Sequence, residues 1–215
     1  MTPPQRYQQP RGGNCSGRPL TAALAGLVCL GCILGCQQTR RNHRLPPDCL
    51  PVRYEAATTH ATCLVSSVVM ASNYLLADRR LSERGVQVDL KRLGYDETRV
   101  GDLKAYLRQL PERLYLVTLT GQLDAKPPAG LRYWLEQRGY PVICVINRDP
   151  RSDPGFNHAV VVIGISTNRK GTSADIVHYL DPSSVEQLHS EPVDEFEMIW
   201  AGADHAMMIV CQEPT

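Results

Sequence analysis

Four short apolar runs in the C-terminal half of the chain restrict its fold more than any other feature. They are "PVICVIN" (141–147), "HAVVVIGI" (158–165), "DIVHYLD" (175–181) and "HAMMIV" (205–210). β-Branched residues dominate most of them, and loops rich in Gly, Pro, Asn and Asp separate them, which is the pattern of short strands. The pattern predicts a meander of mostly antiparallel strands.

The part of the chain that precedes these runs has mostly helical patterns. Apolar residues three and four positions apart predict a largely buried helix over 62–77 and an amphipathic helix over 98–110. A strand over 114–120 and a third helix over 129–139 follow. Helices followed by an antiparallel sheet define an α+β protein, and 215 residues are enough for one domain with its own core.

The first 35 residues have the composition of an export signal rather than of a folded segment. Three arginines precede an uncharged apolar stretch, 20–34, which is shorter than the roughly 20 residues that span a bilayer. The stretch ends in "ILGC", which resembles a bacterial lipobox with Cys36 as the lipidated residue. Cys32 is a competing site, and a plainly cleaved signal or an uncleaved anchor are the alternatives.

This signal defines the expected organisation of the chain. Residues 36–53 are polar and proline-rich, which predicts a flexible tether, and residues 54–215 are expected to form the domain. A lipid on Cys36 would place that domain in the bacterial cell envelope, anchored to a membrane, on its periplasmic or extracellular side.

Net charge argues against nucleic acid as a partner. The whole chain carries a formal charge of +1, and without residues 1–35 it keeps 20 basic against 22 acidic side chains. The six histidines show no metal-ligand spacing, so neither a metal nor another cofactor is expected.

Four of the eight cysteines remain after the signal and the lipidated residue are set aside: Cys49, Cys63, Cys144 and Cys211. They could form two disulfides in an oxidising compartment. Cys144 and Cys211 lie in apolar, strand-like runs, however, where reduced buried thiols are common, and the partner of Cys49 stays open.

Cys63 is the candidate nucleophile because it lies at the predicted start of the first helix. Unpaired backbone N–H groups and the helix dipole favour a thiolate there. His158 opens one strand run and Asp181 closes the next. Antiparallel pairing of these strands would bring the two side chains together, as in Cys-His-Asp triads. The alternatives are a buried core thiol, a strand-end histidine and a turn residue before Pro182.

The ordered set of a cysteine at a helix start, "G-x-P-V-I-x-V", "H-A-V-V-V-I-G" and "L-D-P" resembles the papain-like cysteine peptidases of the bacteriocin-processing type, which cleave double-glycine leaders. The resemblance covers about residues 54–212. It implies a papain-like fold with the nucleophile helix packed on the sheet, and Cys63 as nucleophile, His158 as base and Asp181 as the residue that orients it.

Two departures from that family lie next to the nucleophile. The family has a glutamine six residues before the cysteine, whose amide donates to the oxyanion, and this chain has Ala57 there. "T-C-L" replaces "D-C-G". Thr58, Thr59 or His60 could donate instead, and the loop "RDPRSDPGFN" before His158 could border a substrate cleft.

The expected function is therefore an envelope-anchored hydrolase that cleaves a peptide or amide bond in a peptide or protein substrate. Export argues against leader processing in the cytoplasm. The alternatives are an inactive relative that binds a peptide or an envelope partner, and an acyl transferase that uses the same triad.

Overall fold

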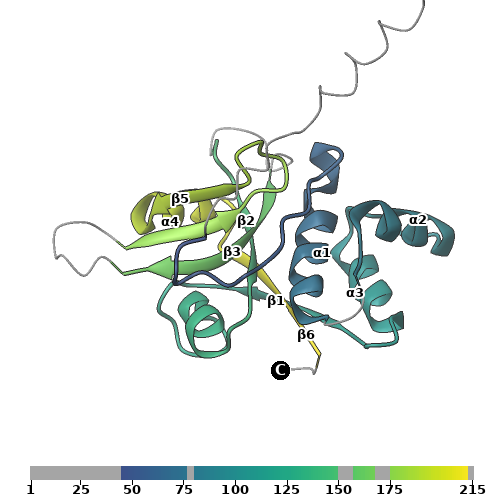
Figure 1. Ribbon diagram of the computed structural model, residues 1–215, viewed down its shortest axis with the longest axis horizontal. Coiled ribbons are helices and arrows are strands. Elements are labelled where there is room, and N and C mark those ends of the chain that lie inside the picture. Colours follow the sequence, from purple (N-terminus) through teal and green to yellow (C-terminus); the bar gives the residue numbers. More distant parts are fainter. Residues whose placement is uncertain (1–44, 77–79, 150–156, 168–174, 213–215) are drawn as a thin grey trace, which may run out of the picture. The chain divides into compact units, whose positions relative to one another are not determined.

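The computed structural model describes residues 45–76, 80–149, 157–167 and 175–212 of the 215-residue chain (Figure 1). These residues belong to a compact unit, His43–Thr215. The predicted signal and Cys36 lie outside the described residues. No helix in the described part is long and apolar enough to cross a membrane.

A six-stranded antiparallel sheet forms the centre of this unit, with strand order β1-β6-β2-β3-β4-β5. The strands are β1 (Tyr115–Thr120), β2 (Val142–Ile146), β3 (His158–Ser166), β4 (Ile176–Leu180), β5 (Leu188–Pro192) and β6 (Ala206–Cys211). Strands β2, β3 and β4 form the part of the meander that the sequence predicts, and β5, which was not predicted, extends it. The prediction that 205–210 continues it was wrong, because β6 returns across the sheet and pairs between β1 and β2.

One face of the sheet is covered by α1 (Cys63–Leu75), α2 (Glu83–Leu93) and α3 (Val100–Gln109), which group on one side of β3 and β6 in Figure 1. The 3₁₀ turn η1 (His60–Thr62) leads into α1. Buried α1 side chains, among them Val65, Val69 and Met70, pack against Val161 of β3. This confirms the predicted buried helix and the α+β class, with the helix that begins at Cys63 packed on the sheet.

Helix α2 was not predicted from the sequence because only Val86 and Leu90 supply large apolar side chains to its buried face. Its ends carry ordinary capping residues. The Ser82 side chain accepts from the Gly85 N–H at 3.2 Å, and Gly94 ends the helix in the left-handed conformation, φ 72°. Tertiary packing therefore decides that this polar segment is helical.

The opposite face of the sheet packs against α4 (Val193–Ala201) and the π-helical turn η2 (Tyr133–Gln137). The predicted helix over 129–139 contains this turn, and Gly139 follows it at φ 66°. Trp134, Phe196 and Trp200 are buried there against Val142 and Val160. Since both faces are covered, the inner strands β2, β3 and β6 are apolar at nearly every position rather than alternating.

Residues 45–53, which composition assigned to the tether, lie on the compact unit. The Leu50 N–H donates to the Ile163 carbonyl of β3 at 2.8 Å, and Val52 is buried. Gly164 makes room for this segment, because a Cβ at that position would lie 2.6 Å from the Asp48 carbonyl oxygen. Apolar side chains of this proline-rich run, Leu45, Cys49, Leu50 and Val52, thus pack on the core.

Candidate active site

Cys63 is the first residue of α1 and its side chain is buried, with 7% of the residue exposed. The thiol therefore lies where the helix dipole favours negative charge. A hydrogen bond fixes α1 to β3 just beyond His158, since Ser67 Oγ donates to the Ala159 carbonyl at 3.1 Å. The helix start thus has a defined position relative to the strand that carries the histidine.

His158 and Asp181 meet at the ends of neighbouring strands. His158 is the first residue of β3, Asp181 follows β4, and the two strands pair antiparallel, with Val161 opposite Leu180. Nε2 of His158 lies 2.6 Å from Oδ1 of Asp181. The Ser183 N–H also donates to Oδ1 at 2.8 Å and holds the carboxylate in place. The predicted juxtaposition of the two side chains is confirmed.

The third side chain joins this pair through the imidazole. The thiol of Cys63 and the imidazole of His158 are close enough that each shifts the pKa of the other. Because Asp181 occupies Nε2, Nδ1 is the ring nitrogen that remains for the sulfur. The structure therefore brings all three predicted site residues into one thiol–imidazole–carboxylate line, while their catalytic roles stay predictions.

The electrostatics of this line favour an ion pair. Burial by itself would raise the pKa of the Cys63 thiol, but its hydrogen bond to His158, helped by the Ala159 backbone and the imidazolium charge, lowers it. Burial would lower the pKa of His158, yet Asp181 and Cys63 together raise it to about 9. Burial also opposes ionisation of Asp181, and bonds to His158 and Ser183 nevertheless lower its pKa. A thiolate beside an imidazolium is the form a cysteine nucleophile requires.

The other described cysteines have different surroundings. All four are free thiols. Burial and the Asp48 charge raise the pKa of Cys49 to about 11, and burial, with a contribution from Glu197, raises that of Cys144. Among Cys49, Cys63 and Cys144, only Cys63 has a pKa below the ordinary value.

A cavity of about 670 Å³ opens beside the imidazole and carboxylate. Its walls consist almost entirely of polar side chains: His60, Asn147, Arg148, Asp149, His158, Asp181, Ser183 and Ser184. Arg148 and Asp149 belong to the loop that was expected to border a cleft, whose residues 150–156 lie outside the described part. Ser183 and Ser184 were not predicted, because they reach the cleft only through the β4–β5 turn.

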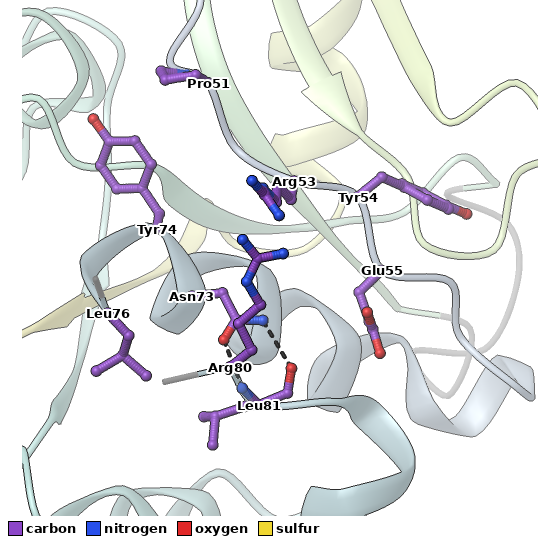
Figure 2. Close-up of a pocket in the computed structure, with 9 residues that line it drawn as sticks. All are labelled: Pro51, Arg53, Tyr54, Glu55, Asn73, Tyr74, Leu76, Arg80 and Leu81. Carbon is purple, nitrogen blue, oxygen red and sulfur yellow. Dashed lines mark hydrogen bonds between the residues drawn. The ribbon is translucent and has the colours of Figure 1, made fainter. Parts of the chain in front are cut away.

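A second, smaller cavity of about 310 Å³ lies near the C-terminal end of α1 (Figure 2). Arg53 and Arg80 point toward each other in it, and Asn73 joins α1 to the next segment through hydrogen bonds with both backbone groups of Leu81. Positive side chains complement the negative end of a helix. This cavity is lined by neither a thiol nor an imidazole, so it is not the site of the predicted chemistry.

The segment before Cys63 is held against the turn that follows Asp181. The Tyr54 hydroxyl donates to the Pro182 carbonyl at 3.0 Å, and the Ala57 N–H donates to the same oxygen at 2.8 Å. Ala57 has no side-chain donor, so the position of the family's glutamine offers no amide to an oxyanion. The described residues contain no cluster of three side chains that could hold a metal ion.

No protein-family model matches the chain, and no curated protein sequence matches it. Several solved structures, however, are similar to the chain. A double-glycine-motif protease from an AMS/PCAT transporter, solved with its leader peptide, is 18% identical, with a TM-score of 0.50 over 80% of this chain and 97% of its own.

Two further structures are similar. The peptidase domain of Streptococcus ComA, a bifunctional ABC transporter of a quorum-sensing pathway, is 12% identical, with a TM-score of 0.52 over 75% of this chain and 99% of its own. A C39-like peptidase from Bacillus anthracis is 15% identical, with a TM-score of 0.52 over 77% and 96%. The chain therefore has the papain-like fold of double-glycine peptidase domains, as the resemblance predicts.

Proposed function

We propose that this chain is a cysteine peptidase or a closely related amide hydrolase, with Cys63 as nucleophile, His158 as acid and base, and Asp181 as the residue that orients the imidazole. The observation that carries the proposal is the line from the Cys63 thiol through His158 to Asp181, with a 2.6 Å bond at its end. A buried thiol without function would stay protonated, and it would not need His158 and Asp181 nearby to offset the cost of burying a thiolate.

In this mechanism the Cys63 thiolate attacks the carbonyl carbon of the scissile bond. The tetrahedral intermediate collapses as His158 donates its proton to the leaving nitrogen, and the acyl group stays on sulfur. Water then attacks the thioester, with neutral His158 accepting the proton, which regenerates the ion pair. Asp181 keeps the imidazole in the orientation that presents Nδ1 to sulfur and stabilises its positive charge.

Alkylation by iodoacetamide at pH 6 tests the activated thiolate. An ordinary thiol is only about 0.3% ionised at that pH, so fast alkylation of one residue requires a lowered pKa. We expect Cys63→Ala to abolish the fast phase and His158→Ala to slow it at least tenfold. Cys49→Ala is the matched control, because its thiol is half-buried and its pKa is raised to about 11. A wild-type rate no faster than that of free cysteine would overturn the proposal.

Peptides are the substrate class that we propose, because the fold is that of peptidase domains and the cleft beside His158 is open to the surface. Cleavage of a peptide library, with Cys63→Ala as the inactive control, would define the bond. An acyl transferase with the same triad would instead give products extended by an added amine.

A second candidate function is peptide binding without turnover, and the Ala57 position favours it. The missing amide removes one oxyanion donor, which can cost about 100- to 1,000-fold in rate. A purified domain that binds library peptides while leaving them intact, with Cys63 alkylated no faster than a free thiol, would support this alternative.

Anchoring to the envelope through Cys36 is a separate proposal that rests on the lipobox-like sequence alone. Metabolic labelling of wild type and Cys36→Ser with a palmitate analogue tests it, and Cys32→Ser serves as the matched variant. We expect Cys36→Ser alone to lose the label. Equal labelling of wild type and Cys36→Ser would refute the assignment.

A further inference from the structure

The proposed chemistry needs a hydrogen-bond donor for the oxyanion, and the residues before Cys63 are its natural source. Charge develops on the carbonyl oxygen as sulfur attacks, next to the start of α1. Ala57 cannot supply a side-chain donor, and its N–H is already bonded to the Pro182 carbonyl. Another group must take the place that an amide side chain would have filled.

Most hydrogen-bond donors of the threonines in this segment have other partners. Both the N–H and the hydroxyl of Thr58 donate to Oε1 of Glu83, at 2.9 and 2.8 Å. The Thr59 N–H donates to Oγ1 of Thr62 at 3.2 Å, and the Thr62 hydroxyl donates back to the Thr59 carbonyl at 2.9 Å. These bonds form the turn that precedes α1, so the groups that make them are not available to a substrate. The Thr59 hydroxyl is not among these donors, but Thr59 does not line the cavity beside His158 and Asp181.

Unlike Ala57, His60 has a side-chain donor, and unlike the bonded groups of Thr58 and Thr62, that donor has no partner among the described residues. It begins the 3₁₀ turn directly before Cys63, and its exposed side chain lines the same cavity as His158 and Asp181. Within the described part of the chain it has no hydrogen bond, ion pair or ring contact. A ring N–H that faces a cleft without a partner is a donor available to bound substrate.

We infer that His60 is a further catalytic residue, whose ring N–H donates to the oxyanion of the tetrahedral intermediate. The inference deepens the proposed function and rests on it. As the Cys63 sulfur forms its bond to the carbonyl carbon, the carbonyl π pair moves to oxygen, and His60 donates a hydrogen bond to that oxygen. On collapse the C=O bond reforms, the C–N bond breaks, and the leaving nitrogen takes its proton from His158. His60 neither gains nor loses a proton.

Two small probes of Cys63 separate this role from activation of the thiolate. p-Nitrophenyl acetate acylates sulfur through a tetrahedral oxyanion, whereas iodoacetamide alkylates it by displacement at a saturated carbon without one. We expect His60→Ala to slow burst acylation by about 100-fold or more and to leave the alkylation rate within about twofold of wild type. His60→Gln, which restores an amide donor, should recover part of the acylation rate.

A control histidine lies outside the cleft. His205 is bonded to Glu197 at 3.0 Å and has a positive φ of 52°, so His205→Asn is the variant that its backbone tolerates. It should leave both rates unchanged.

Unchanged acylation in His60→Ala, with fast alkylation of the wild type, would overturn the inference and leave the proposed function standing. An equal fall in both rates would also overturn it, because His60 would then act on the thiolate. Slow alkylation of the wild type itself would refute the proposed function.

Discussion

Replacement of Asp181 by asparagine tests the electrostatic basis of the site most directly, because it removes a charge and keeps an oxygen acceptor 2.6 Å from Nε2. The pKa of His158 is about 9, some 2.5 pH units above its ordinary value of 6.5, although burial acts in the opposite direction. Asp181 and Cys63 must therefore raise it by more than that difference. Asp181 is the larger contributor both as a hydrogen-bond partner and as a charge.

Loss of the Asp181 charge should accordingly lower the pKa of His158 by at least about one pH unit, or about 1.4 kcal/mol in favour of the neutral imidazole. NMR titration of ¹³C-labelled histidine rings measures this directly, and the spectrum of His158→Ala identifies the resonance. An imidazole that titrates near 6.5 in the wild type, or at the same pH in both proteins, would refute the reasoning.

The same variant should change how stability depends on pH. A histidine whose folded-state pKa is raised stabilises the protein fully below its unfolded value of about 6.5 and loses this contribution as the pH rises through about 9. We therefore expect the wild type to exceed Asp181→Asn in Tm at pH 6.5, and the difference to shrink toward pH 9.5. A difference that grows over this range would contradict the assignment.

Substitutions at four positions of the framework give further predictions, each measured by urea unfolding. Gly164→Ala should lower the free energy of unfolding by about 1–3 kcal/mol, because its Cβ would meet two backbone atoms within 3 Å. Gly101→Ala in α3, where a Cβ meets nothing within 4 Å, should raise it by up to about 1 kcal/mol; equal effects would contradict the packing. Trp200→Ala should cost about 3–5 kcal/mol, because the side chain is fully buried, and a cost below 1 kcal/mol would be inconsistent with that. Glu83→Ala should lower the free energy of unfolding by about 1–3 kcal/mol, because it leaves two Thr58 donors unpaired. Glu83→Gln keeps an oxygen acceptor and should retain most of the stability. Equal losses in the two variants would show that the acceptor oxygen does not contribute to stability.

Local patterns in the sequence were sufficient for most of the helices and strands. The buried helix at Cys63 and the strands that carry His158 and Asp181 were predictable because their apolar residues follow the period of each element. Helix α2 and strand β5 were missed. The first is mostly polar, and the second, "LHSEP", has almost no apolar residues and forms only by pairing with β4.

The candidate triad was likewise predictable, but only as three residue types at the ends of three elements. Antiparallel pairing of neighbouring strands is a local rule, so the approach of His158 to Asp181 followed from the sequence. The approach of Cys63 to His158 did not, since it depends on how α1 packs across β3.

By itself, the sequence determined the α+β class, the helix start that presents Cys63, and the strand ends that carry its two partners, because each depends on spacing within a short segment. Only the tertiary structure decided that β6 lies between β1 and β2, that the hydroxyls of Thr58 and Thr62 are bonded elsewhere, and that His60 lines the cleft. These features depend on contacts between residues that are distant in the chain or bonded around a single turn, and no periodic pattern encodes them.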